Sequence, residues 1–533
     1  MKKTVEILKL DSKGRGIGRV DNKTIFIFNA LPDEIVEVAN VKERSKYITA
    51  TSINILKKSS KRINTICPWF GICGGCDIMH MSYLDQLKYK EDKVKNTILN
   101  VLKDDIKINS IVFDSNLNYR NKAIFKVDKK IGFYGKETHE IVGISSCFLV
   151  DEKINKILSI ISSSISLEGI KEIMIRVSKN TDESLILFTL SKKINEEKII
   201  SVLKNEVNSI VTYLDEYKVL FGNGFIYEKI GAYVFKISPE SFFQVNTNGA
   251  YKLYSVVKHY IDKNDSVLDL YCGIGSIGIF ISDKSRKVLG VELNKYAVED
   301  ALENKKINDL KEVNFMCLNT SDFNRSLRDI DVVIVDPPRS GLDKKTISYL
   351  LKEKAKKIIY VSCDLMTLTR DLGYLKEFYD IKEITPVDMF PNTYHVETVA
   401  LLSRQINVHK MKLNSTHFEM IKSGEKMIEL RLYDEKRQQV KVGDNIIFTN
   451  TSTGETLNTT VTKLHRFDSF KELYKSLPLL KCGYTIENVD NAKPSDMEQY
   501  YSVEEQNKYG VVGIEICRPK KITDEVVSYM SLK

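Results

Sequence analysis

The chain has 533 residues and a formal net charge of +9, from 80 Lys and Arg against 71 Asp and Glu. This length exceeds what one ordinary hydrophobic core supports and predicts three or four domains. The content of 43% hydrophobic and 28% charged residues excludes a disordered or membrane-embedded chain, and the positive excess alone does not identify a nucleic-acid partner.

The first residues and the cysteine count indicate the compartment. The segment 1–16 is interrupted by charge before a signal-like apolar core can form, and no later segment has the long uncharged run of a membrane span. We therefore expect a cytoplasmic protein without a membrane partner, and we infer no obligate protein partner. Nine cysteines, an odd number, argue against a disulfide framework and for thiolate chemistry or metal binding.

Residues 1–58 contain short strand-like runs separated by glycines and a proline. This pattern predicts a small OB-like β-barrel. Lys42, Arg44 and Lys46 should lie on or beside a strand edge. They would either keep that edge soluble or contact RNA, and the sequence leaves both open.

Residues 59–235 follow a polar, basic linker and contain four cysteines with ligand-like spacing. Cys67, Cys73 and Cys76 are close together and Cys147 follows downstream, so four thiolates are available. Four thiolates can hold an iron–sulfur cluster or zinc, and unliganded structural cysteines are the third possibility. Strand-like runs around a helical stretch near residues 153–164 predict an α+β unit.

Residues 236–405 alternate apolar strands with helices, as in a doubly wound parallel sheet. Within them, Asp269-Leu-Tyr-Cys-Gly-Ile-Gly-Ser-Ile-Gly278 follows a strand, and its glycines let the backbone turn tightly beside a ligand. Glu292 ends the next strand, where its carboxylate can accept hydrogen bonds from ribose hydroxyls. A glycine-rich turn alone can reflect close packing, but the two signals together predict a nucleotide-cofactor site.

Reactive groups follow at the ends of later strands. Asp336-Pro-Pro-Arg339 forms a rigid turn, and Cys363 ends the next strand, at the edge where open α/β sheets bind ligands. His395 and Glu397 precede the terminal strand and supply a base. A buried strand-end thiol and a solvated polar turn are the alternatives.

Five ordered motifs together resemble the RNA uracil-5 methyltransferase family over residues 1–404. They are Gln244 in Ser241-Phe-Phe-Gln-Val-Asn246, the loop at Asp269, Asp336-Pro-Pro-Arg339, Ser362-Cys363 with Thr367-Leu-Thr-Arg-Asp-Leu372, and His395-Val-Glu397. One position departs from the family pattern: the usual Asn-Pro after the catalytic cysteine is Asp364-Leu365 here. This departure puts the local loop contacts in question.

The resemblance implies a multidomain α/β enzyme with a TRAM domain at 1–58, an iron–sulfur and RNA-binding domain at 59–235, and a class I methyltransferase domain at 236–405. It implies S-adenosylmethionine held by Gln244, Tyr271, Glu292 and Asp336. It also implies a [4Fe-4S] cluster on Cys67, Cys73, Cys76 and Cys147. Members act on ribosomal or transfer RNA, and the four cysteines favour 23S rRNA over tRNA.

The family chemistry accounts for the two reactive residues. Uracil carbon 5 accepts a methyl group only after a thiolate adds at carbon 6, so Cys363 is the expected nucleophile. Glu397 is the expected base that removes the carbon 5 proton, and the target base must leave its stack to enter the site. A catalytically silent RNA-binding protein and an iron–sulfur redox enzyme are the rival functions.

Residues 408–533 extend beyond the usual end of the family and resemble an ASCH domain, a small barrel related to PUA modules. Lys426, Glu429 and Arg431 are expected to converge on an RNA-facing cleft, or else to form a solvated ion-pair surface. Some ASCH-like proteins resemble nucleoside amidohydrolases, which would make this domain a second enzyme. RNA binding is the expectation that we favour.

Overall fold

The computed structural model describes residues 3–324, 329–353 and 355–517. The chain divides into two compact units, Met1–Arg404 and Gln405–Lys533. Residues 518–533 of the expected ASCH-like domain lie outside the described residues. Within the described ranges, no helix is long and apolar enough to cross a membrane.

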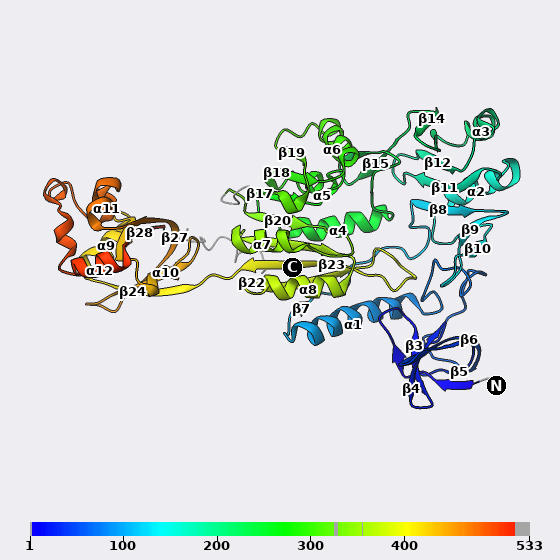
Figure 1. The fold of residues 1–533 in the computed structure, drawn as a ribbon, viewed down its shortest axis with the longest axis horizontal. Coiled ribbons are helices and arrows are strands. Elements are labelled where there is room, and N and C mark those ends of the chain that lie inside the picture. Colours follow the sequence, from blue (N-terminus) through cyan, green and yellow to red (C-terminus); the bar gives the residue numbers. More distant parts are fainter. Residues whose placement is uncertain (1–2, 325–328, 354, 518–533) are drawn as a thin grey trace, which may run out of the picture. The chain divides into compact units, whose positions relative to one another are not determined.

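The first domain is a curled sheet of short strands (Figure 1). Their order is β1-β5-β6-β4-β3-β2. Gly18 makes the close approach of β3 to β1 possible, because a Cβ atom there would come within 2.4 Å of Val5 Cγ1. Ile25, Ile27 and Val36 alternate into the small apolar interior. The strands are β1 Lys3–Glu6, β2 Lys9–Leu10, β3 Gly16–Val20, β4 Lys23–Phe28, β5 Ile35–Glu43 and β6 Tyr47–Lys57.

The middle of the chain forms a seven-stranded sheet in the order β10-β9-β8-β11-β12-β13-β14. Helices α2 Glu152–Ser164 and α3 Glu196–Leu203 share a core with one face of this sheet. Met174 and Leu185 on the other face belong to the methyltransferase core instead. The expected α+β character and the helix near 153–164 are confirmed. The strands are β8 Lys122–Val127, β9 Ile131–Tyr134, β10 Ile141–Gly143, β11 Ile170–Val177, β12 Ser184–Leu190, β13 Ser209–Tyr213 and β14 Tyr217–Phe221, followed by the hairpin β15 Ile226–Ile230 and β16 Tyr233–Ile237.

An eight-stranded sheet forms the centre of the first unit, in the order β19-β18-β17-β20-β21-β23-β22-β7. Strands β17 to β21 are parallel, as expected, whereas β23 runs antiparallel between β21 and β22. The strands are β7 Lys107–Ile108, β17 Asp265–Leu270, β18 Ser285–Glu292, β19 Val313–Cys317, β20 Val332–Val335, β21 Lys357–Ser362, β22 Tyr379–Val387 and β23 Glu397–Arg404.

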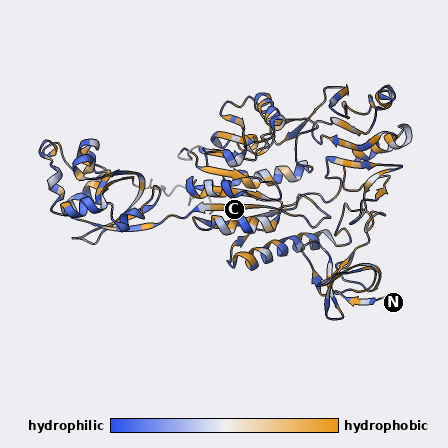
Figure 2. Ribbon diagram, viewed as in Figure 1, coloured by the Kyte–Doolittle hydropathy of each residue, from blue (hydrophilic) through white to orange (hydrophobic). Residues whose placement is uncertain are grey.

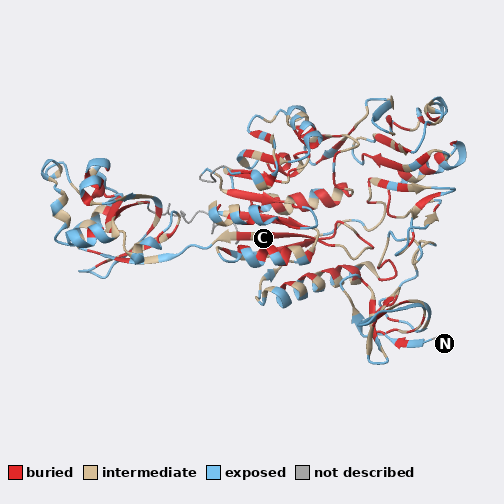
Figure 3. Ribbon diagram, in the orientation of Figure 1, coloured by how far each residue is buried: buried red, intermediate tan, exposed pale blue. Residues whose placement is uncertain are grey.

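Apolar side chains on alternate positions of these strands enter two cores. Val267 packs toward α4, α5 and α6, and the adjacent Leu268 packs toward α1, α7 and α8. The central strands β17, β20 and β21 are therefore mostly apolar in Figure 2 and buried in Figure 3. The helices are α1 Tyr83–Leu102, α4 Thr247–His259, α5 Ser276–Phe280, α6 Lys295–Ile307, α7 Lys344–Glu353 and α8 Leu365–Leu375.

Helix α1 and strand β7 belong to this sheet in space, although the sequence groups them with residues 59–235. Leu87, Val94 and Ile98 bury one face of α1 in the core beneath α8, and Lys107 of β7 pairs with Glu383 of β22. The boundary expected at residue 236 therefore does not separate α1 and β7 from the methyltransferase fold.

The second unit has its own five-stranded sheet, in the order β24-β26-β27-β28-β25. Phe418, Ile446 and Phe448 are fully buried in its core. The strands are β24 Val408–Leu413, β25 Ile428–Leu432, β26 Asn445–Asn450, β27 Thr456–Phe467 and β28 Val511–Cys517, and the helices are α9 Ser415–Ser423, α10 Glu435–Gln438, α11 Phe470–Ser476 and α12 Val503–Tyr509.

Candidate active site

Cys363 and Glu397 lie beside each other at the carboxyl end of β21. Strands β21 and β23 are antiparallel and Ser362 pairs with Thr398, so the next residues along, Cys363 and Glu397, face each other across the same strand pair. The Thr398 hydroxyl donates to the Ser362 carbonyl at 3.1 Å and fixes this register. The two residues that the sequence predicts as nucleophile and base are thus brought together.

Burial sets the protonation of this pair. It raises the pKa of the Cys363 thiol to about 11, and the neighbouring Glu397 contributes to the rise. Burial likewise raises the pKa of Glu397 to about 8, with a further contribution from Asp336. Arg339 opposes both shifts. Both groups are therefore mainly protonated at neutral pH.

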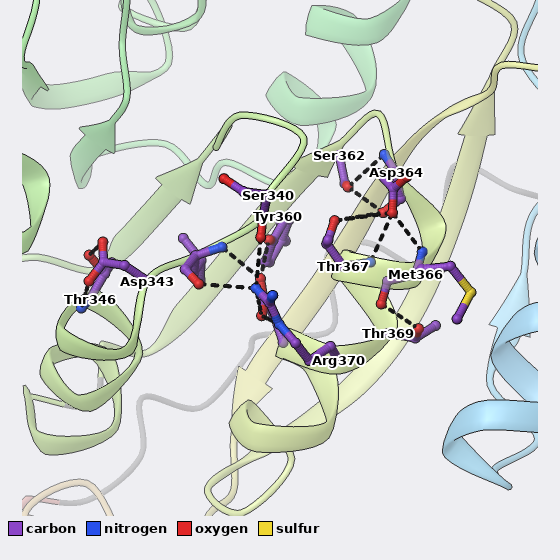
Figure 4. A network of polar contacts seen from close by, with 12 residues as sticks. Ser340, Asp343, Thr346, Tyr360, Ser362, Asp364, Met366, Thr367, Thr369 and Arg370 are labelled. Atoms are coloured by element: carbon purple, nitrogen blue, oxygen red, sulfur yellow. Dashed lines mark hydrogen bonds and ion pairs between the residues drawn. The ribbon is translucent and has the colours of Figure 1, made fainter.

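The residue after the cysteine begins helix α8. Asp364 is its N-cap, because its Oδ1 accepts from the backbone N–H of Met366 at 3.0 Å and of Thr367 at 2.9 Å (Figure 4). Asp and Asn cap helices equally well, and Leu365 occupies the first helical position, where Pro is tolerated but not required. The departure from the family's Asn-Pro therefore leaves the cap intact.

Helix α8 also holds the Asp336-Pro-Pro-Arg339 turn in place (Figure 4). Thr367 Oγ1 donates to the Arg339 carbonyl at 3.2 Å, and Arg370 Nη2 donates to the carbonyl of Ser340 at 3.0 Å. The buried Asp371 accepts from the Tyr360 hydroxyl at 2.6 Å. These contacts give the Thr367–Leu372 motif a physical role: it fixes the turn that carries Arg339 toward Cys363.

The loop after β17 has the open geometry of a cofactor site. Tyr271 adopts a φ of 64°, a backbone conformation that is unusual for a bulky side chain. A Cβ atom at Gly273 would meet nothing within 4 Å, so this part of the loop faces open space. Asp269 Oδ2 accepts from the Gly278 N–H at 3.1 Å, while its buried Oδ1 has no hydrogen-bond partner among the described residues.

Two other predicted cofactor residues, Glu292 and Asp336, lie beside this loop. Glu292 ends β18, and its carboxylate accepts from the backbone N–H of Gly273 at 3.1 Å and of Asn294 at 2.8 Å. Asp336 follows β20 beside the loop, since its N–H donates to the Leu270 carbonyl. Gln244 is buried just before α4. The open space and the acidic strand end suit a nucleoside cofactor.

The four predicted cluster cysteines line one pocket of about 510 Å³, together with Arg120, Tyr394 and His395. Burial raises the pKa of Cys67, Cys73 and Cys76, and the proximity of the other thiols adds to it. Among the described residues, no three His, Cys, Asp or Glu side chains are grouped closely enough to chelate a metal ion. Four thiols are a donor set that both iron–sulfur clusters and zinc use.

In the second unit, the three predicted residues do converge, but not on a solvated surface. Lys426 and Glu429 are buried and form an ion pair at 2.9 Å. Arg431 pairs with the other oxygen of Glu429 at 2.8 Å, and Lys426 Nζ lies 3.2 Å from His417 Nδ1. The alternative of an ordinary solvated ion-pair surface is therefore wrong.

Sequence reasoning missed the residues that hold the loop leading into Glu397. Tyr83, Gln86, Lys90 and Lys93 of α1 reach this loop from about three hundred residues away along the chain. Local patterns do not mark such contacts. The buried Lys90 in an otherwise amphipathic helix is a signal that becomes visible only once the packing of α1 is known.

Comparisons with known families agree with this geometry. The profile of the tRNA (Uracil-5-)-methyltransferase family matches residues 82–405, that of the TRAM domain residues 2–51, and that of the ASCH domain residues 411–520. An uncharacterized RNA methyltransferase of Clostridium tetani is 36% identical over 74% of this chain and 95% of its own. One of Oceanobacillus iheyensis is 35% identical over 76% and 97%.

A solved structure has a similar fold. The Pyrococcus abyssi tRNA (uracil-54, C5)-methyltransferase, in complex with S-adenosyl-L-homocysteine, superposes with a TM-score of 0.63 and is 26% identical. The match covers 75% of this chain and 99% of that one. The chain therefore belongs to the tRNA (uracil-5-)-methyltransferase family of S-adenosylmethionine-dependent RNA methyltransferases, with an N-terminal TRAM domain and a C-terminal ASCH domain.

Proposed function

We propose that this chain methylates carbon 5 of a uridine in 23S rRNA through a covalent adduct between Cys363 and carbon 6. The observation that carries the proposal is the strand register that sets Cys363 opposite Glu397. Cys363 adds to carbon 6, carbon 5 takes the methyl group from S-adenosylmethionine, and Glu397 removes the carbon 5 proton so that the sulfur–carbon bond can break. Gln244, Tyr271, Glu292 and Asp336 hold the cofactor.

Two substitutions test these roles against a silent RNA-binding protein. Cys363→Ala should abolish methyl transfer and every covalent complex with RNA. Glu397→Gln should still form the adduct but fail to release it, so that enzyme cross-linked to methylated RNA accumulates on denaturing gels. Methyl transfer by Cys363→Ala would contradict the nucleophile, and normal release by Glu397→Gln would contradict the base.

A tRNA uridine is the second candidate substrate, and the likeness to an enzyme that acts on tRNA uracil-54 favours it. The deciding experiment offers the protein labelled S-adenosylmethionine with unmodified 23S rRNA and unmodified tRNA in separate reactions. The labelled nucleotide is then mapped. Label confined to tRNA would replace 23S rRNA by the second candidate.

The pocket lined by Cys67, Cys73, Cys76 and Cys147 is proposed to hold a [4Fe-4S] cluster, supported by four thiols around one space of about 510 Å³. Its role is structural, since these cysteines belong to a segment that contacts the loop before Glu397. Protein purified without oxygen should contain about four irons and absorb broadly in the visible range. Stoichiometric zinc instead would contradict the cluster.

The ASCH domain is proposed to bind RNA. Buried Lys426, Glu429 and Arg431 neutralise one another, so their network shapes the domain and other surface groups contact phosphate. Removing residues 408–533 should weaken RNA binding and make the remaining affinity less dependent on salt, because fewer phosphates are then neutralised. Unchanged RNA affinity would contradict this role.

A further inference from the structure

The loop from Asp388 to Val396 leads directly into Glu397 and is anchored by a lysine from helix α1. Lys90 Nζ donates to Asp388 Oδ1 at 2.6 Å and to the Phe390 carbonyl at 3.0 Å. The side chains of Lys90 and Asp388 are both fully buried. The Tyr83 hydroxyl donates to the other oxygen of Asp388 at 3.0 Å.

Two neighbours on the same face of α1 hold the rest of the loop. Gln86 Nε2 donates to Asn392 Oδ1 at 3.1 Å, and the Asn392 N–H donates back to Gln86 Oε1 at 2.9 Å. Lys93 Nζ donates to the Tyr394 carbonyl at 2.8 Å. Positions 86, 90 and 93 are three and four residues apart and therefore share one helix face. This face forms hydrogen bonds with the loop through three residues, and the bond to Tyr394 lies three residues before Glu397.

A buried lysine–carboxylate pair is a poor device for stability alone. The cost of removing both charges from water offsets their attraction, and apolar residues of similar size serve equally well in many proteins. The Lys90 ammonium donates hydrogen bonds to Asp388 and to the Phe390 carbonyl at the same time. These two bonds restrict the conformation of the loop. The pair therefore specifies one loop conformation.

We propose that Lys90, acting with Asp388, is a positioning residue that holds Glu397 where it can remove the carbon 5 proton. This inference rests on the proposed role of Glu397 as the base. Lys90 contacts the loop that carries Glu397 and not Cys363 or the cofactor loop, so we expect its loss to affect mainly the step in which Glu397 acts. The addition of Cys363 and the transfer of the methyl group precede that step.

RNA that carries 5-fluorouridine at the target separates the steps. Cys363 adds to carbon 6 and carbon 5 takes the methyl group as before, which converts S-adenosylmethionine to S-adenosylhomocysteine. Carbon 5 then bears fluorine in place of hydrogen, so no proton is available for the base and the sulfur–carbon bond persists. The rate at which this adduct forms thus reports the steps before Glu397, and turnover of uridine RNA reports all of them.

The variant Lys90→Met keeps the length of the side chain and removes its donors. We expect the 5-fluorouridine adduct to form within about twofold of the wild-type rate, while turnover of uridine RNA falls about a hundredfold, the size of a general-base contribution. Methylated RNA cross-linked to the enzyme should accumulate. Lys95→Met, an exposed lysine on the same helix, is the matched control and should leave both rates unchanged.

In Lys90→Met the buried Asp388 carboxylate has lost its cation, which could prevent folding. A second variant is therefore needed. Lys90→Met with Asp388→Asn removes both charges, and we expect wild-type thermal stability with the same selective loss of turnover. Equal loss of both reactions, or loss of neither, in the folded variant would overturn the inference. If wild-type enzyme itself forms no 5-fluorouridine adduct, the proposed function fails instead, which is a distinguishable result.

Discussion

At the scale of single residues, Cys363 depends on the charges around it. Its thiol and the carboxyl group of Glu397 are buried together, and burial raises the pKa of both. Arg339 is the cation that opposes these shifts. The reactivity of the site therefore follows from one arginine on a rigid turn and from pH.

The two pKa shifts predict how the rate depends on pH. Where proton removal limits turnover, the rate should rise with pH and level off above about 8, because the base must be ionised and Glu397 has then lost its proton. Adduct formation with 5-fluorouridine RNA should keep rising beyond that point, because the thiol has a pKa of about 11. Rapid-quench measurements across this range test both limbs. A turnover profile flat around neutral pH would contradict the burial of Glu397.

Removing the opposing cation should slow the first step. In Arg339→Met, the pKa of Cys363 rises further, and at neutral pH the thiolate fraction falls about tenfold when that pKa rises by about one. We therefore expect adduct formation on 5-fluorouridine RNA to fall about tenfold at neutral pH and to recover partly at high pH. Arg339→Lys keeps the positive charge, so its rate of adduct formation should fall less. A defect independent of pH would assign Arg339 to RNA binding rather than to the thiol.

At the scale of elements, helix α8 connects Cys363, the proposed nucleophile, to the turn at residues 336–341. Its N-cap Asp364 is adjacent to Cys363, and its later residues Thr367 and Arg370 hold the backbone of the 336–341 turn. The start of the helix therefore sets the position of the thiol.

Substitutions of the cap test this connection. Asp364→Asn restores the usual family residue and should change neither stability nor adduct formation. Asp364→Ala removes the acceptor for two N–H groups and should lower the free energy of unfolding by about 1 kcal/mol in urea titrations. It should also slow adduct formation. An effect of Asp364→Asn as large as that of Asp364→Ala would show that charge, and not capping, is what Asp364 supplies.

The buried ion pairs of the ASCH domain make a prediction of their own. Glu429→Gln leaves Lys426 and Arg431 as buried cations without their carboxylate. Breaking such a network costs about 3–5 kcal/mol. Hydrogen exchange of the whole protein should show faster exchange in β25 and β28 and no change in the methyltransferase sheet. Unchanged protection would mean that water reaches the network.

Local sequence patterns predict much of this architecture. Period-two runs and strand–helix alternation identify β8, β12, α2 and the parallel strands β17, β18, β20 and β21. Strand ends also locate Cys363 and Glu292, because chemistry in parallel sheets gathers at the carboxyl edge. The antiparallel insertion of β23, which sets Glu397 beside Cys363, follows from no local pattern.

The features that local patterns do not predict depend on contacts between residues far apart in the sequence. Lys90 reads as an ordinary helix lysine until its partner Asp388 is known. For Lys426, Glu429 and Arg431 the sequence leaves open an RNA-facing cleft or a solvated ion-pair surface, because it does not show that Lys426 and Glu429 are buried. Burial of polar side chains is decided by tertiary packing, so these are the positions where sequence reasoning fails.

At the scale of the whole molecule, catalysis and the ASCH domain occupy separate units. The unit 1–404 contains the complete methyltransferase sheet with both of its cores, and the unit 405–533 has its own sheet and core. Removing 408–533 should therefore leave the turnover number on a short RNA within about twofold, since each unit has its own core and independent units add without coupling. Steady-state kinetics on short and long RNA separate the effect of the truncation on turnover from its effect on RNA binding. A fall in turnover on the short RNA would contradict the independence of the units.

The contacts between α1 and the loop before Glu397 also affect how the protein folds during its synthesis. Helix α1 leaves the ribosome early, and its apolar face cannot be covered until β22, the loop and α8 have been synthesised about three hundred residues later. Contacts this distant in sequence close slowly and leave hydrophobic surface exposed meanwhile. We expect nascent chains that end before α8, at residue 365, to hold α1 uncovered and to bind chaperones, whereas chains that extend past Arg404 contain every element of this core and of the active site.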